Sequence, residues 1–208
     1  MQNTLRDSLL ANAQWYHRWR QLLKADDVVR TWVEEYLRPE SGDRVLDVGC
    51  GDGQVRPLLG DVEYLGIDLN EDYLSVAAAR ADGRTHFLHA DVADLPKMNL
   101  GPFDLVIGVG LLHHLSDDSA DSLLRGVRDV LVPGGRLVTL DPVFHPEQQT
   151  VARVLAALDR GRFVRDQGGY ERLIAAHLAI KRVEARHDLA WFPYSHCVVE
   201  AVRPAGVS

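Results

Sequence analysis

The chain has 208 residues, of which 46% are hydrophobic and 25% charged, as expected of a soluble globular protein with one compact domain. Its net charge of −7 argues against sequence-independent binding to nucleic acid, which needs a basic face. No apolar run is long enough to span a bilayer, and no basic amphipathic helix suggests a membrane surface.

The cysteine content and the first residues indicate the cellular compartment. The two cysteines, Cys50 and Cys197, do not have the spacing of a disulfide framework, a zinc site or a haem attachment. The N-terminal stretch lacks the apolar core and small-residue cleavage site of a secretion signal. We therefore expect a cytoplasmic protein without a bound metal.

Two helices are predicted before the core of the domain. Residues 4–24 have a helical pattern that ends in several aromatic side chains, and residues 25–39 form an amphipathic helix stopped by Pro39. Residues 1–40 thus form a helical N-terminal extension.

From residue 41 to residue 141 short apolar runs alternate with amphipathic stretches. Strands are predicted at residues 43–49, 62–69, 85–92, 103–112 and 136–142. Helices are predicted between them at residues 53–60, 70–81 and 117–135. This alternation predicts an α/β fold with a doubly wound, Rossmann-like parallel sheet.

The remainder of the chain predicts two more helices and two closing strands. The helices cover residues 145–160 and 169–179, and the strands cover residues 181–189 and 195–202. Residues 142–180 would cover the sheet edge as a helical lid, and residues 181–208 would complete the single domain of residues 1–208. Residues 1–150 carry a charge of −10 and residues 151–208 a charge of +3. This difference arises either by chance or because the C-terminal part faces an anion.

A glycine-rich turn follows the first core strand in "VLDVGCGDG" (residues 45–53). Glycines at such a turn let the backbone approach a ligand; a tight strand-to-helix turn without a ligand is the alternative. The dinucleotide motif G-x-G-x-x-G fails because its sixth position is Gln54. The phosphate loop fails because no Gly-Lys-Ser or Gly-Lys-Thr follows.

Two acidic residues end the next two strands. Asp68 ends the strand in "GIDLN", where a carboxylate reaches the ribose hydroxyls of a nucleotide bound at the carboxyl edge of the sheet. Asp91 ends the strand in "HADVADLP", where it can accept from an adenine amino group while the Val92 N–H meets a ring nitrogen. Together with the glycine turn, these residues predict a nucleoside-like ligand.

With "FDLVIGVGLLHHL" and "VPGGRLVTLD", these motifs give a sequence that resembles the class I S-adenosylmethionine-dependent methyltransferases. The resemblance implies a seven-stranded sheet with a final antiparallel strand and S-adenosylmethionine as the cofactor. It also implies that the cofactor would be bordered by Asp47, Gly49, Cys50, Gly51, Asp68, Leu69, Asp91, Val92 and Gly110.

Two adjacent histidines, His113 and His114, follow the fourth core strand. A neutral imidazole there can take a proton from an acceptor hydroxyl or amine, so both are candidate catalytic residues, although a histidine at a helix start often caps or packs. The Asn/Asp-Pro-Pro-Tyr/Phe motif of amino-methylating nucleic-acid enzymes is absent. Neither cysteine is placed to attack a pyrimidine carbon. The resemblance therefore favours a small-molecule acceptor, methylated on oxygen or nitrogen.

The acceptor would bind under the segments that cover the carboxyl edge of the sheet. Arginines in the lid suggest a polar or anionic acceptor; packing on the core and a solvated loop are the alternatives for these segments. The candidate substrate-binding residues are Tyr16, Arg18, His145, Arg162, Arg165, Tyr170, Tyr194 and His196. A regulatory protein that binds the cofactor without catalysis, and an enzyme acting on a macromolecule, stay open, as does the choice between monomer and homodimer.

Overall fold

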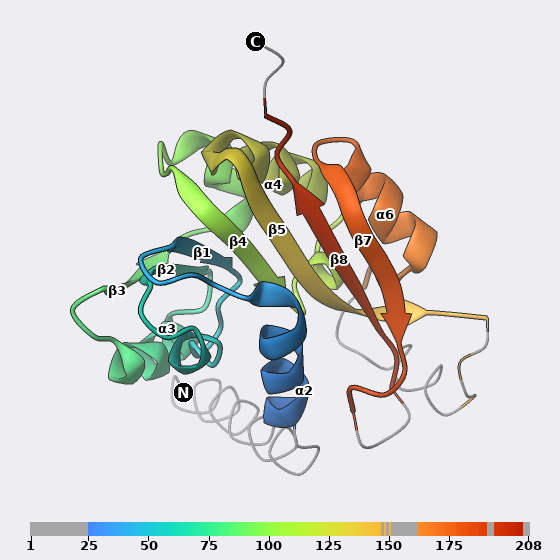
Figure 1. Ribbon diagram of the computed structural model, residues 1–208, viewed down its shortest axis with the longest axis horizontal. Coiled ribbons are helices and arrows are strands. Elements are labelled where there is room, and N and C mark those ends of the chain that lie inside the picture. Colours follow the sequence, from blue (N-terminus) through green and yellow to red (C-terminus); the bar gives the residue numbers. More distant parts are fainter. Residues whose placement is uncertain (1–24, 147, 149, 151–161, 191–193, 206–208) are drawn as a thin grey trace, which may run out of the picture.

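The computed structural model describes residues 25–146, 148, 150, 162–190 and 194–205. The fold is a twisted sheet covered by helices on both faces (Figure 1). The predicted doubly wound α/β class is confirmed.

Five parallel strands form the first part of the sheet, in the order β3-β2-β1-β4-β5. Their carboxyl ends therefore meet at one edge, and the order reverses between β1 and β4, which is where such sheets bind ligands. The strands are β1 (Arg44–Val48), β2 (Glu63–Asp68), β3 (Thr85–His89), β4 (Phe103–Val109) and β5 (Leu131–Phe144).

Two closing strands complete the sheet beyond β5. β8 (His196–Val202) pairs antiparallel with β5, and β7 (Ala179–Arg186) pairs antiparallel with β8. This confirms the predicted final antiparallel strand. The two-residue strand β6 (Arg165–Asp166) pairs with the end of β5 and is an eighth strand that the sequence pattern does not predict.

The helices bury their apolar faces on opposite sides of the sheet. α2 (Ala25–Trp32) and the π-helical turn η1 (Val33–Leu37) pack on one face. α4 (Asp117–Val130) and α6 (Gln167–Ala175) pack side by side on the other (Figure 1). The remaining helical segments are α3 (Glu71–Ala77) and the 3₁₀ turns η2 (Arg56–Leu58), η3 (Ala78–Arg80), η4 (Val92–Lys97) and η5 (Leu112–His114).

Two predicted helices differ from the structure. Residues 53–60 form only the turn η2, because Pro57 lies within a segment too short to build a helix between Gly53 and Gly60. The helix predicted at residues 117–135 ends at Val130, and β5 begins at Leu131, so the Pro-Gly-Gly segment belongs to the strand.

The N-terminal cap of α3, which directly follows β2, can be tested by substitution. The Asn70 side chain accepts hydrogen bonds from the backbone N–H groups of Asp72 and Tyr73. Asn70→Ala is expected to lower the free energy of unfolding by about 1 kcal/mol because these donors lose their partner. Asn70→Asp preserves the cap and is the matched control. Urea denaturation of the three proteins measures the difference, and equal losses in both variants would contradict this role.

Within the described part of the chain, no helix combines the length and apolar character needed to cross a bilayer. The predicted helix at residues 4–24 and most of the one at residues 145–160 lie outside the described residues.

Candidate active site

The turn after β1 has three glycines in the left-handed region of φ. Gly49, Gly51 and Gly53 have φ of 73°, 54° and 72°, which side chains rarely adopt. A Cβ at Gly49 would lie 2.9 Å from the Leu111 side chain, whereas a Cβ at Gly51 would meet nothing within 4 Å. The turn is thus tightly packed at its first glycine and faces open space at its second, where a ligand can approach the backbone.

The thiol of Cys50, the second residue of this turn, packs against β2 at Gly66. The side chain is buried, and a Cβ at Gly66 would lie 2.8 Å from its Sγ atom. Burial raises the pKa of the Cys50 thiol far above its usual range. Any cofactor contact of Cys50 is therefore one of its backbone, and the thiol is a packing group.

Asp47 places a buried carboxyl at the end of β1. It is 1% exposed, and the Tyr64 hydroxyl donates to its Oδ2 atom at 2.6 Å. Its Oδ1 atom has no hydrogen-bond partner among the residues that the structure describes. Burial raises the pKa of the Asp47 carboxyl from 3.8 to about 7, against the lowering effect of the Tyr64 hydrogen bond. Such a carboxyl favours a cationic or hydrogen-donating ligand.

Asp68 connects the end of β2 to the glycine turn. Its Oδ2 atom accepts from the Gly51 backbone N–H at 2.8 Å, and its Oδ1 atom accepts from the Asn70 N–H at 2.8 Å. Each carboxylate oxygen retains a second acceptor position. The next residue, Leu69, is 63% exposed, so an apolar side chain stands beside these acceptor positions.

Asp91 follows β3 and caps η4. Its side chain is exposed, with Oδ1 accepting from the Ala93 backbone N–H at 2.9 Å. Val92 is buried in the core, which leaves its main chain as the group available to a ligand. Since β1, β2 and β3 are neighbours in the sheet, Asp47, Asp68 and Asp91 follow one another along its carboxyl edge.

A buried histidine–aspartate pair joins the turn after β4 to the neighbouring strand β5. The Nδ1 atom of His113 is 2.9 Å from Oδ1 of Asp141, and the His113 backbone N–H donates to the same oxygen at 3.2 Å. The two side chains are 4% and 1% exposed. The second carboxylate oxygen, Oδ2, has no hydrogen-bond partner among the described residues. Gly110, with φ of 63°, precedes this turn, and a Cβ there would lie 3.5 Å from the His113 ring.

This pair adds to the predicted site. The sequence identifies His113 as a candidate base but does not pair it with Asp141. The usable signal is that His113 shortly follows β4, and that Asp141 lies in the neighbouring strand β5, one position past the last residue pair of the two strands. His114 is exposed, with its ring centroid 4.0 Å from that of His113. Tyr64, the hydrogen-bond partner of Asp47, is a second site residue that the sequence reasoning did not identify. It could have been found because β2 lies beside β1 in the predicted sheet.

Arg165 does not take the role expected of it. Its five N–H groups are directed to protein oxygens: the carbonyls of Leu112, Phe163 and Leu115, and Oδ1 of Asp117, which takes two. The predicted contact with an acceptor is therefore corrected, because this guanidinium has no donor left for a substrate. Arg162 is exposed and remains a candidate for that contact.

Tyr170 is also placed differently. It is 1% exposed, and its hydroxyl donates to the Pro142 carbonyl at 2.9 Å. Burial raises the pKa of the Tyr170 hydroxyl well above its usual range. Its predicted substrate contact is corrected to a packing role between α6 and β5.

The remaining predicted substrate residues lie near β7 and β8 or outside the described chain. The ring of His145 contacts that of His187 at 5.1 Å, and the ring of Tyr194 contacts that of His196 at 5.0 Å. Of these four residues, His145, Tyr194 and His196 are predicted substrate residues. None of the four is fully buried. Tyr16 and Arg18 lie outside the described residues.

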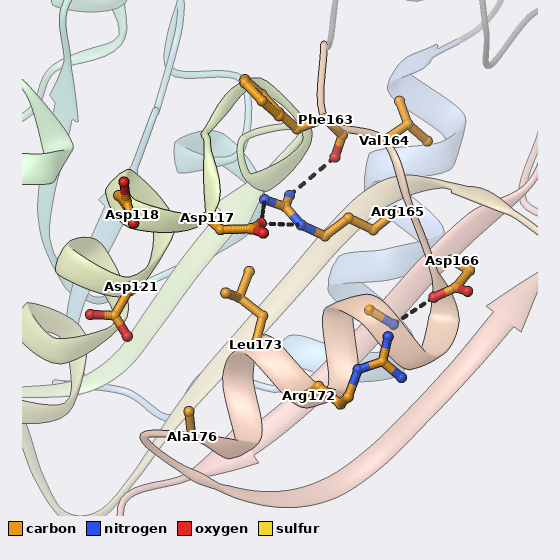
Figure 2. A pocket seen from close by; sticks show the side chains of 11 residues that line it. Asp117, Asp118, Asp121, Phe163, Val164, Arg165, Asp166, Arg172, Leu173 and Ala176 are labelled. Carbon is orange, nitrogen blue, oxygen red and sulfur yellow. Dashed lines mark hydrogen bonds and ion pairs between the residues drawn. The ribbon is translucent and has the colours of Figure 1, made fainter.

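An open cleft of about 800 Å³ lies between the start of α4 and α6 (Figure 2). Its lining includes Asp117 and also Arg165, which binds the turn that bears His113. None of the residues predicted to hold the cofactor lines this cleft. Phe163, at its rim, is 40% exposed. Over the described ranges, no group of three His, Cys, Asp or Glu side chains is placed to bind a metal ion.

Comparison with known proteins finds similarity to methyltransferases. Residues 45–135 match the family model described as "Methyltransferase domain". The chain is 26% identical over 134 residues to a ubiquinone biosynthesis O-methyltransferase of Acinetobacter baylyi, covering 60% of this chain and 56% of that protein. It is 36% identical over 114 residues to the 27-O-demethylrifamycin SV methyltransferase of Amycolatopsis mediterranei, covering 51% and 41%. The chain thus matches about half the length of these curated relatives.

Among solved structures, the fold is similar to magnesium protoporphyrin IX methyltransferase from Synechocystis PCC 6803 with bound SAH. The TM-score is 0.66 at 20% sequence identity, over 92% of this chain and 95% of that one. At this identity the likeness concerns the fold alone.

Proposed function

Because this chain belongs to the class I S-adenosylmethionine-dependent methyltransferases, we propose that it methylates a hydroxyl group, or an amine, of a small polar metabolite. The observation that carries the proposal is the row of Asp47, Asp68 and Asp91 beside the glycine turn, with the pair His113–Asp141 at the same edge of the sheet. The printed names of two curated relatives support oxygen as the methylated atom. One is a ubiquinone biosynthesis O-methyltransferase, and the other is a 27-O-demethylrifamycin SV methyltransferase.

The chain's own residues fit S-adenosylmethionine. The unpaired Oδ1 atom of Asp47 complements a cofactor that carries a sulfonium and an ammonium group. Asp68 has acceptor positions for ribose hydroxyls, and Leu69 offers an exposed apolar surface beside it. The open space at Gly51 admits the ligand. When bound, the cofactor supplies an electrophilic methyl group.

His113 is suited to remove the proton of the acceptor. A carboxylate accepts hydrogen bonds, so Asp141 favours the tautomer in which Nδ1 of His113 carries the hydrogen. The lone pair then lies on Nε2, which takes the proton from the acceptor hydroxyl as that oxygen gains its methyl group. Asp141 also holds the ring in place through the His113 backbone N–H. The base thus comes from the turn after β4, and its orienting group comes from the neighbouring strand β5.

Two features of the chain bear on the charge of the acceptor. With the donors of Arg165 directed to protein oxygens, an anionic acceptor rests on exposed Arg162 and on the excess of basic residues in the last 58 positions. A neutral phenol or alcohol fits the histidine–aspartate pair equally well, so the acceptor class is defined by its hydroxyl group.

Replacement of Asp68 tests the cofactor site. Asp68→Ala is expected to weaken binding of S-adenosylmethionine by about 10- to 100-fold, because hydrogen bonds to a charged group are lost. Asp94→Ala, an exposed carboxylate that pairs with Lys97 one turn beyond Asp91, is the matched control. Isothermal titration calorimetry measures both. Absence of binding to the unaltered protein, or equal affinity of both variants, would overturn the assignment.

Turnover separates this proposal from the two alternatives that the sequence leaves open. Formation of S-adenosylhomocysteine with a fraction of low-molecular-weight metabolites, or with a panel of hydroxybenzoates, supports a small-molecule enzyme. Cofactor binding without turnover on any fraction would favour a regulatory protein. Turnover only with protein, RNA or lipid would favour a macromolecular acceptor.

A further inference from the structure

The turn that carries His113 is too short to fix its own position. η5 is a single 3₁₀ turn of three residues, closed by hydrogen bonds from His114 to Leu111 and from Leu115 to Leu112. An isolated turn of this length is unstable, so its geometry depends on contacts from elsewhere in the fold. Asp141 supplies one such contact on the side of β5.

Arg165 supplies the contacts on the other side. Its Nη1 donates to the Leu112 carbonyl at 2.8 Å and its Nη2 to the Leu115 carbonyl at 2.9 Å, so the guanidinium spans the turn from its first residue to its exit. It also binds Asp117 in the first turn of α4, at 2.6 Å from Nη2 (Figure 2). The arginine side chain is 12% exposed.

The segment around Arg165 is itself held against the His113 turn and against β5. The Phe163 backbone N–H donates to the His113 carbonyl at 2.9 Å. Arg165 pairs with Val143 of β5, two residues after Asp141. The Tyr170 hydroxyl binds the carbonyl of Pro142, and Arg165 lies over its ring. The guanidinium is therefore fixed relative to the strand that bears Asp141.

We propose that Arg165 is a positioning residue for the candidate base, because it holds the His113 turn against Asp141. The proposal rests on the function proposed above for His113. Asp117 is 84% exposed, and an ion pair with so exposed a carboxylate contributes little. The specific contribution is the planar fork that reaches two carbonyls at once, a geometry that a lysine cannot reproduce.

Arg165→Lys tests the proposal because it keeps the charge and removes the fork. The amides of His113, His114, Leu115 and Phe163 are expected to exchange with deuterium about tenfold faster or more, because their turn loses its external hydrogen bonds. In spectra of protein with ¹⁵N-labelled histidine, His113 is expected to lose its single Nδ1–H tautomer. Affinity for S-adenosylmethionine is expected to stay within about twofold, while kcat with the best hydroxybenzoate falls about 10- to 100-fold.

Two further variants keep the test decisive. Arg172→Lys, an exposed arginine of α6 that lines the same cleft, is expected to leave exchange and kcat unchanged. Asp117→Asn weakens the carboxylate contact and leaves the carbonyl contacts, so it is expected to accelerate the same amides to a smaller extent, and it decides the question should Arg165→Lys not fold. Unchanged amide exchange and tautomer, or altered exchange with unchanged kcat, would overturn the proposal. Failure of the proposed function shows separately, as absence of cofactor binding or turnover by the unaltered protein.

Discussion

Asp141→Asn and His113→Ala are each expected to lower kcat by about two to four orders of magnitude, which is the usual contribution of a positioned general base. His113→Ala removes the base itself. Asp141→Asn leaves the ring in place and presents an amide, whose N–H₂ can donate to Nδ1 and so favour the tautomer with the hydrogen on Nε2. That tautomer has no lone pair on Nε2 to receive the acceptor proton.

The measurement is the initial rate of S-adenosylhomocysteine formation at saturating acceptor and cofactor. Cofactor affinity by calorimetry is expected to change little, since neither residue belongs to the row Asp47, Asp68 and Asp91. His86→Ala, an exposed histidine on β3, controls for the loss of an imidazole. His114→Ala is expected to have a smaller effect than His113→Ala. Wild-type kcat in both Asp141→Asn and His113→Ala would exclude the pair as the proton acceptor.

Asp47→Asn is expected to raise stability at pH 8 while weakening the binding of S-adenosylmethionine about tenfold or more. The pKa of the Asp47 carboxyl is about 7 in the folded state against 3.8 in the unfolded reference. The folded protein therefore binds more protons than the unfolded chain between these two pH values. The free energy of unfolding falls as the pH rises through that window, because a buried carboxylate must ionise.

The amide of Asp47→Asn removes this pH-dependent penalty. Three pH units correspond to about 4 kcal/mol, and burial of an unpaired amide N–H₂ costs about 1–3 kcal/mol. The expected net gain is about 1–3 kcal/mol at pH 8, and the sign reverses near pH 5, where the Asp47 carboxyl is already neutral. The Tyr64 hydroxyl keeps an acceptor in either case.

Urea denaturation at pH 5 and pH 8 measures the stability, and calorimetry measures the cofactor affinity. In the unaltered protein that affinity is expected to increase from pH 6 to pH 8, because a cationic ligand favours the ionised Asp47. In Asp47→Asn this part of the pH dependence is expected to disappear. A variant equally destabilised at both pH values, or one that keeps wild-type affinity, would contradict the role assigned to Asp47.

Local patterns were sufficient for the strands of the core and for the order of motifs along them. The apolar runs before the glycine turn, before Asp68 and before Asp91 are strands, and they end within three residues of the prediction. Helix boundaries were less well predicted. Residues 53–60 lack the length to propagate a helix, and the Pro-Gly-Gly segment after Val130 lies in a strand that tertiary pairing with β4 and β8 extends.

The sequence by itself determined the fold class, the resemblance to a methyltransferase family and the order of the motifs along the sheet edge, because a buried strand and a glycine turn are written in neighbouring positions. Only the tertiary structure decided which side chains meet. His113 and Asp141 are 28 positions apart, and the Arg165 guanidinium meets carbonyls 50 and 53 positions earlier. Such pairs depend on sheet register and on the packing of α4 and α6. Backbone carbonyls carry no signature in the sequence, so an arginine bound to them and an arginine awaiting a substrate have the same pattern until the fold is known.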